Sequence, residues 1–169
     1  MKLRLLTFAV LAGALPSLGA ATPVRVQASP AGTAQCVATS LAENAAAARA
    51  TSLRRARSGL PPLRANDRLA RAAAQHACDM ARRGVMAHQG SRTRGPAQRV
   101  KGVGYRPAIT AENIAAGPFD LAGVLTAWNA SAGHLGNIML PQARDFGIGR
   151  ALGSDGRTVF WAAVYAAPG

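Results

Sequence analysis

The sequence has few cysteines, few acidic residues and few aromatic residues, and these shortages exclude several classes of protein. Its two Cys are too few for a zinc finger built on four thiolates or for a disulfide-rich miniprotein. Charged residues amount to 16% and hydrophobic residues to 49%, which excludes a disordered chain and provides enough apolar side chains for one packed core.

The shortage of acid leaves most of the positive charge uncompensated, because 20 Lys and Arg stand against 7 Asp and Glu, a formal net charge of +13. Aromatic residues make up only 5% and there is no RNP or helix-turn-helix signature, so we do not expect nucleic-acid binding. We interpret the arginines, Arg55 and Arg99 among them, as a solvated surface. The alternative is attraction to anionic lipid headgroups or acidic polysaccharide of a cell envelope.

A long hydrophobic run is missing except near the N-terminus. Lys2 and Arg4 precede an apolar run from Leu5 to Leu15, and small residues follow at 19–21, an order typical of a secretory signal peptide. The run of about eleven residues is too short to span a bilayer core of ~30 Å. We therefore predict a signal peptide over 1–21, cleaved after Ala20 or Ala21, no transmembrane segment and a secreted protein, extracellular or periplasmic. An uncleaved membrane anchor is the alternative.

The remaining chain is predicted to hold a flexible lead-in, residues 22–33, and one domain, residues 34–169. A helix is expected over 33–58, with an apolar stripe at Val37, Leu41, Ala45, Ala48 and Leu53. A second helix is expected from Asn66 or Asp67 to Gly84, with an inner face at Leu69, Ala73, Ala77 and Met80. Residues 84–107 contain many glycines and are predicted to be irregular.

The C-terminal half is predicted to hold two short helices and a hairpin. The helices are expected over 120–129 and up to Leu140, and the hairpin strands over 145–152 and 157–165. Both faces of the last strand are apolar, which indicates a strand buried on both sides. A sheet covered twice, in a chain with several helices, predicts an α-β-α sandwich.

Export changes the interpretation of the two cysteines. In an oxidising compartment an even pair usually forms a disulfide, so we predict a Cys36–Cys78 bridge between the first and second predicted helices. Two free thiols are the alternative.

Two of the three histidines are predicted to lie in a loop or at the end of a helix. His76 lies in the middle of a predicted helix and is interpreted as a packed helix residue, whereas His88 and His134 lie in a loop and at a loop-to-helix junction, where functional residues concentrate. Glu112 lies between them in an apolar segment, and a buried carboxylate there needs a partner such as an imidazole or a metal ion. Ser131 is interpreted as the N-cap of the helix that contains His134, with a Ser–His nucleophile pair as the alternative.

The ordered series MAHQGS, AENIAAG, WNASAGHLGNIMLP, FGIG and VFWAAVYA resembles the CAP superfamily, the cysteine-rich secretory, antigen-5 and pathogenesis-related-1 proteins, in its short bacterial SCP-like branch. The resemblance runs from about Leu41 to Pro168. It implies an α+β fold, an α-β-α sandwich with a small central antiparallel sheet.

The resemblance also implies a cleft lined by two histidines and two acidic residues. His88, Glu112 and His134 match three of them and would hold a divalent metal such as Zn, whereas Ser131 stands where other branches carry the second acid. Asn113, Trp128 and Ser131 would line the cleft, and Glu112 is the candidate general base if the protein is an enzyme.

These observations favour a secreted, monomeric binding protein whose cleft holds a metal and an apolar, lipid, sterol or acidic cell-envelope ligand. A metal-dependent hydrolase that uses the same cleft is one alternative. A polybasic envelope-adhesion protein with an inert cleft is the other.

Overall fold

The protein is described by a computed structural model over residues 25–169, and the predicted signal peptide lies outside this range. Among the described residues the elements follow the order β1 (Arg25–Gln27), β2 (Gln35–Cys36), α1 (Leu41–Ala56), β3 (Arg64–Ala65), α2 (Asp67–Arg83), β4 (Val85–Ala87), α3 (Pro96–Gly102), β5 (Pro107–Gly117), α4 (Leu121–Ala130), α5 (Ala132–Ile138), β6 (Asp145–Leu152) and β7 (Val159–Pro168). None of the described helices is long and apolar enough to cross a membrane.

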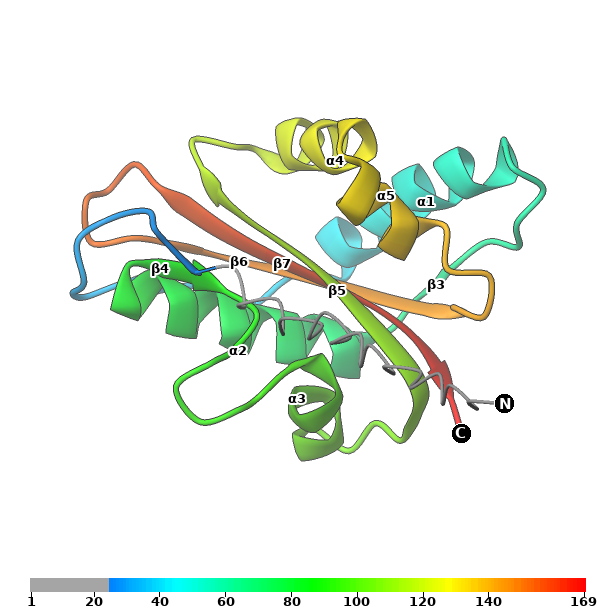
Figure 1. Ribbon diagram of the computed structural model, residues 1–169, viewed down its shortest axis with the longest axis horizontal. Helices are drawn as coiled ribbons and strands as arrows, with labels where there is room; N and C mark the ends of the chain where they lie inside the picture. The colour runs from blue at the N-terminus through cyan, green and yellow to red at the C-terminus, as the bar shows by residue number, and fades with distance from the viewer. Residues whose placement is uncertain (1–24) are drawn as a thin grey trace, which may run out of the picture.

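The main sheet lies between two layers of helices. Its strands run in the order β2-β6-β7-β5, with the short β3 paired in parallel to β6 and all other pairs antiparallel. Helices α2 and α3 cover one face, and α1, α4 and α5 cover the other (Figure 1). The predicted α-β-α sandwich with a small antiparallel sheet is confirmed.

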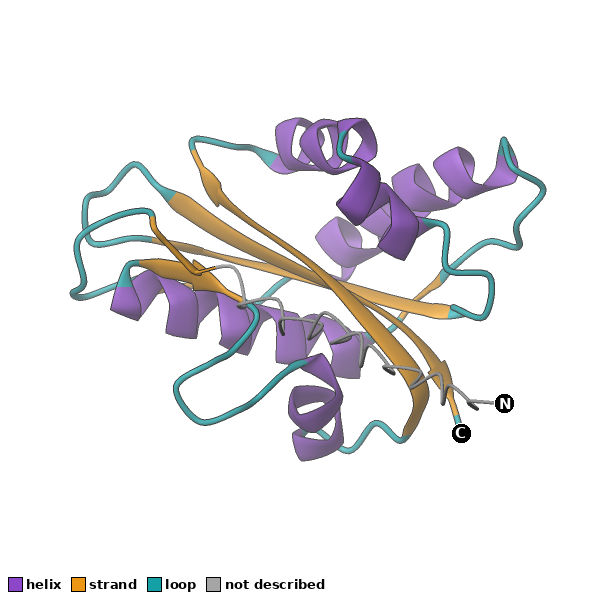
Figure 2. Ribbon diagram, in the orientation of Figure 1, coloured by secondary structure: helices purple, strands orange, loops and turns teal. Residues whose placement is uncertain are grey.

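Strand β7 occupies the centre because both of its faces are apolar. Phe160, Ala162 and Val164 pack in the cluster that contains the apolar face of α2. On the other face, Trp161, Ala163 and Tyr165 pack with residues of α1, α4 and α5. The predicted burial of this strand on both sides is confirmed, and so is its hairpin with β6 (Figure 2).

Helix α2 has the boundaries that its sequence predicts. The side chain of Asn66 accepts hydrogen bonds from the first backbone N–H groups, and Gly84 ends the helix in the left-handed conformation at φ 65°. The predicted inner face is fully buried, at Leu69, Ala73, Ala77 and Met80. This helix therefore forms one wall of the core.

The prediction for the first helix is wrong at its start and in most of its buried face, of which only Ala48 is confirmed as buried. The helix begins at Leu41, after the N-cap Ser40, because the preceding residues pair as β2 with the edge of β6. Val37, Leu41 and Leu53 are exposed, and the buried face consists of Asn44, Ala47, Ala48, Thr51 and Arg55. A stripe of small and polar residues faces the sheet, which the hydrophobic pattern does not reveal.

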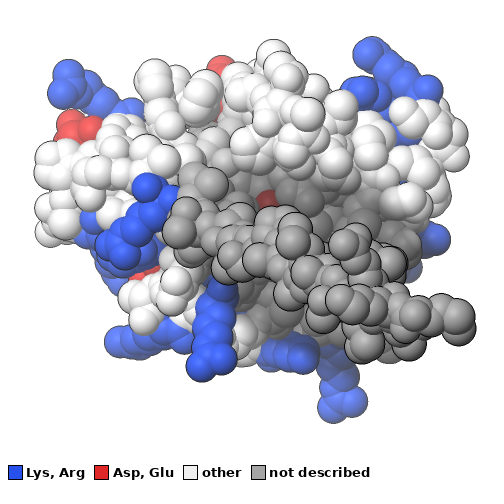
Figure 3. Space-filling view, viewed as in Figure 1, with Lys and Arg blue, Asp and Glu red and all other residues white. Residues whose placement is uncertain are grey.

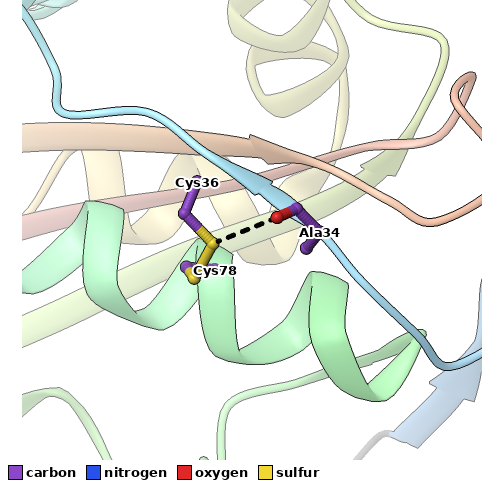
Figure 4. The surroundings of a disulfide bond; sticks show 3 residues. All are labelled: Ala34, Cys36 and Cys78. Carbon is purple, nitrogen blue, oxygen red and sulfur yellow. Dashed lines mark hydrogen bonds between the residues drawn. A yellow bond between two sulfur atoms is a disulfide. The ribbon is translucent and has the colours of Figure 1, made fainter.

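The predicted disulfide is confirmed, and its elements differ from the prediction. Cys36 and Cys78 are bonded with Cα atoms 5.2 Å apart. Cys36 belongs to strand β2 rather than to the first helix, so the bridge joins the edge of the sheet to α2 (Figure 4).

Two segments predicted to be irregular contain regular structure. Residues 84–107 hold β4 and α3, and Arg25–Gln27, within the predicted lead-in, form β1 and pair with β4. The strand β5, which received no assignment from the sequence, pairs with β7 along almost its whole length. Strand β1 pairs with β4 and strand β5 pairs with β7, and both partners are distant in the sequence. Local patterns therefore do not indicate β1 or β5.

Candidate functional site

The site is built around the carboxylate of Glu112, which lies on the α2 side of β5. Glu112 is 4% exposed. Arg99 Nη2 donates to its Oε2 at 2.5 Å, and His88 Nδ1 lies 2.9 Å from its Oε1. The structure thus brings the predicted His88 and Glu112 into direct contact, although 24 residues separate them.

Arg99 belongs to this site, although the sequence predicted it to lie on the solvated surface. It lies on α3 and is buried, and its Nη1 donates to the carbonyl oxygen of His88 at 3.1 Å and to Thr93 Oγ1 at 3.0 Å. One guanidinium therefore holds both the carboxylate and the loop that carries His88. Nothing in its local sequence distinguishes Arg99 from the other arginines.

His76 also belongs to the site, although the sequence predicted only a packed helix residue. Its side chain on α2 is 1% exposed, and its Nε2 lies 3.8 Å from Glu112 Oε1. Neither ring nitrogen has a hydrogen-bond partner among the described residues. Burial lowers the pKa of His76 to about 4, and the negative charge of Glu112 only partly opposes it. His76 is therefore a neutral imidazole behind the carboxylate.

The charge of Glu112 is fixed by its partners. Burial by itself raises the pKa of a carboxyl group, but the hydrogen bond with His88 and the positive charge of Arg99 outweigh it and hold the pKa of Glu112 below its ordinary value. The group is thus an ionised carboxylate with both oxygens engaged.

His134 reaches the site from the opposite layer through a network of amides. Asn113 follows Glu112 on β5, and its Nδ2 donates to the carbonyl oxygen of His134 at 3.1 Å and to the hydroxyl of Tyr165 at 3.2 Å. Asn137 Nδ2 donates to Asn113 Oδ1 at 2.8 Å and to the carbonyl oxygen of Glu112 at 3.0 Å. These bonds fix α5 against β5, so the predicted Asn113 positions His134 through its backbone.

The imidazole of His134 is half-buried. Its Nδ1 is buried and has no hydrogen-bond partner within residues 25–169. Burial and the charge of His88 lower the pKa of His134, and the carbonyl of Ile114 opposes them. The two imidazoles are therefore near enough to influence each other, and His134 is held in its neutral form.

Trp128 and Ser131 have structural positions beside this site. Trp128 is 1% exposed, its Nε1 donates to the carbonyl oxygen of Ile114, and its ring centroid lies 6.4 Å from that of His134. Ser131 precedes α5 at the predicted N-cap position, but its side chain makes no capping hydrogen bond. Its backbone carbonyl accepts from the N–H of Leu135. Trp128 thus supports the histidine from the core.

Only some of the predicted ligands have an arrangement that suits a metal ion. Within the described part of the chain, no group of three or more His, Cys, Asp or Glu side chains is arranged to hold a metal ion. Both oxygens of Glu112 are engaged by Arg99 and His88, so the carboxylate does not fit the role of a direct ligand. The exposed ring of His88 fits an imidazole ligand, and the Nδ1 of His134 is buried, so Nε2 is the nitrogen of His134 that remains for such a role.

A separate groove of about 990 Å³ runs along α2. It includes His76 and Arg99 but not His88, Glu112 or His134. The groove therefore shares His76 and Arg99 with the site around Glu112.

Comparison with known proteins gives consistent matches. The family model "CAP: Cysteine-rich secretory protein family" matches residues 48–165. "Uncharacterized protein YkwD" of Bacillus subtilis (strain 168) is 31% identical over 99 residues, which cover 59% of this chain and 38% of that protein. The chain therefore spans about two fifths of the length of this relative.

Solved structures show the same fold. An extracellular protein containing a SCP domain from Bacillus anthracis superposes with a TM-score of 0.63 at 25% identity, covering 72% of this chain and 39% of that one. An outer surface protein of Borrelia burgdorferi superposes with the same TM-score at 21% identity, covering 72% of this chain and 89% of that one. The resemblance drawn from the sequence motifs is confirmed by these matches.

Proposed function

Since this chain belongs to the cysteine-rich secretory protein (CAP) family, we propose that it acts outside the cytoplasm as a binding protein whose cleft holds a divalent cation through His88 and His134. The observation that carries the proposal is the 2.9 Å contact between His88 Nδ1 and Glu112 Oε1. An imidazole that donates one N–H to a carboxylate presents its other nitrogen as a ligand in a fixed orientation.

The state of the second histidine supports the same assignment. A metal ligand must be a neutral imidazole, and the pKa of His134 is lowered by burial and by the charge of His88. Its Nδ1 is buried, so the other ring nitrogen, Nε2, is the one proposed to bind the cation. Zinc bound there would supply a Lewis acid with coordination positions left for water or a ligand.

Glu112 then has a positioning role. Its two oxygens are held by Arg99 and His88, and its lowered pKa makes it a weak proton acceptor. This favours a binding site over a metal-dependent hydrolase in which Glu112 is the general base.

The proposed location rests on three observations. The N-terminal segment has the charged, apolar and small residues of a signal peptide in the typical order. The protein also contains the Cys36–Cys78 disulfide, and disulfides persist mainly in oxidising compartments. The solved relatives are an extracellular and an outer surface protein. The mass of the protein recovered from the medium or periplasm tests this, and a mass that retains residues 1–20 would contradict cleavage.

The cation proposal is tested by calorimetric titration with zinc at about pH 6 and about pH 7.5, between which an ordinary imidazole loses its proton. We expect one site, tighter binding at the higher pH, and loss of binding in both His88→Ala and His134→Ala. Glu112→Gln should retain the site with affinity reduced by roughly 10–100-fold, as for other groups that orient a ligand. Zinc binding that survives in either histidine variant would overturn the proposal.

A further inference from the structure

The groove along α2 has one mainly apolar wall and one polar wall. Ala70 and Ala74 lie at the side of the groove where α2 packs against β6, and Arg71, Gln75 and Arg82 lie on the exposed face of the helix. One wall is the segment from Cys36 to Leu41, and the other is the segment that leads from Ser91 into α3. The result is a long, shallow channel that follows the helix axis.

The charge that lines this channel is mainly positive, although two carboxylates, Asp67 and Asp79, also line it. Arg71, Arg82 and Arg92 line it and are exposed, and their guanidinium groups make no ion pair or hydrogen bond with other described residues. Asp79, which also lines it, is engaged by Arg83 at 2.9 Å and by the hydroxyl of Ser91. Figure 3 shows Lys and Arg side chains along the edge of the molecule formed by α2 and α3.

Three buried side chains beside the channel keep polar atoms without partners among residues 25–169, namely Asn44 Nδ2, Arg99 Nε and the ring nitrogens of His76. Such atoms are rare in folded proteins, and these are shielded from solvent. The polar surface that the channel offers to a ligand therefore consists of the exposed arginines together with Gln75, Gln98 and Thr93.

We propose that this groove binds a linear acidic polysaccharide. Arg71 and Arg82 lie roughly 16 Å apart along the helix axis at ~1.5 Å per residue, so an extended polymer with repeated carboxylates matches their spacing. Guanidinium groups bind carboxylates bidentately. Gln75, Gln98 and Thr93 also line the groove and supply hydrogen bonds for sugar hydroxyls.

An anionic lipid surface fits less well. The exposed apolar residues that line the groove, Val37 and Leu41, lie on one wall, and no other large apolar side chain of the described residues is exposed along it. This proposal does not depend on cation binding, because neither His88 nor His134 lines the groove.

The test is the binding of polygalacturonate fragments to the purified protein, with fully methyl-esterified polygalacturonate as the uncharged probe of the same backbone. The triple variant Arg71→Gln, Arg82→Gln, Arg92→Gln should bind polygalacturonate roughly tenfold or more weakly. The matched control changes three exposed arginines outside the groove, Arg49→Gln, Arg57→Gln and Arg106→Gln, at the same net charge.

We expect the protein and the control variant to bind polygalacturonate with similar affinity, and neither to bind the methyl ester. Equal loss in both triple variants would overturn the proposal, because diffuse surface charge would then explain binding. Equal affinity for the ester, or no binding to either polymer, would also overturn it. Binding to phosphatidylglycerol vesicles through the groove arginines, without polygalacturonate binding, would replace the polymer by a lipid surface.

Discussion

Arg99 and Glu112 form a buried ion pair across the α2 side of the sheet, with Arg99 Nη2 donating to Glu112 Oε2 at 2.5 Å. Their side chains are 6% and 1% exposed. A charge at this depth requires its partner, since an unpaired buried charge costs several kcal/mol. The pair therefore determines where His88 and its loop lie.

Replacement of Arg99 by Gln is expected to destabilise the protein by about 3–5 kcal/mol, because it leaves the Glu112 carboxylate buried without its cation. Urea unfolding measures this change. The double variant Arg99→Gln, Glu112→Gln should recover part of the loss, because it removes both charges together. A single variant as stable as the wild type would show that water replaces the guanidinium.

Stability should fall on acidification because His76 is buried as the neutral form. Its pKa is about 4 in the folded state, against ~6.5 in the unfolded chain. Between these values the unfolded chain binds more protons, so the stabilisation is complete above pH ~6.5 and is lost as the pH falls towards 4. The expected loss between neutral pH and pH 4 is roughly 3 kcal/mol.

The contribution of His76 is isolated by comparing urea unfolding of the wild type and His76→Gln across this pH range. The free energy of unfolding of the variant should decline less steeply between neutral pH and pH 4. At more acidic pH both proteins should still lose the contribution of Glu112, because the pKa of Glu112 is lowered in the folded state. Identical pH profiles would mean that the ring of His76 is not desolvated in the folded state.

Arg55, near the end of α1, forms hydrogen bonds with the end of α5 and the segment that follows it. It is fully buried, and its guanidinium donates to the backbone carbonyl oxygens of Pro61, Ile138, Leu140 and Ala143. We expect Arg55→Lys to cost at least about 3 kcal/mol, since an ammonium group cannot reach these carbonyls in the same fork. The exposed neighbour Arg57→Lys should change the free energy of unfolding by less than about 0.5 kcal/mol. Equal effects of the two substitutions would contradict the assigned role.

Gly149 on β6 lets the backbone of α2 lie directly on the sheet. A Cβ there would overlap with backbone atoms of Ala73 and Ala74. Gly149→Ala should therefore cost roughly 1–3 kcal/mol or more through overpacking. Gly136 on α5 has no atom within 4 Å of the added Cβ, and Gly136→Ala should be stabilising by about 0.5–1 kcal/mol. Thermal unfolding of both variants separates the two, and a neutral Gly149→Ala would contradict the close contact.

The sequence predicted the elements whose signals are local. Asn66 and Gly84 delimit α2 because an N-cap and a left-handed glycine act within one turn of the helix. The continuous run of apolar side chains, on both faces of the strand, predicted that β7 lies between two layers. For α1 the same reasoning was wrong, because alanines and Arg55, rather than Leu41 and Leu53, face the sheet.

Some residues of the site were likewise predictable from the sequence, and others were not. Residue types and their order pointed to His88, Glu112 and His134, and the predicted export pointed to the Cys36–Cys78 bridge, which the structure contains. The sequence by itself thus determined the family, the central strand and the candidate histidines. Only the tertiary structure decided that Arg99 and His76 surround Glu112, because the pairing of β5 with β7 and the packing of α2 and α3 on that face bring together residues that no local pattern connects.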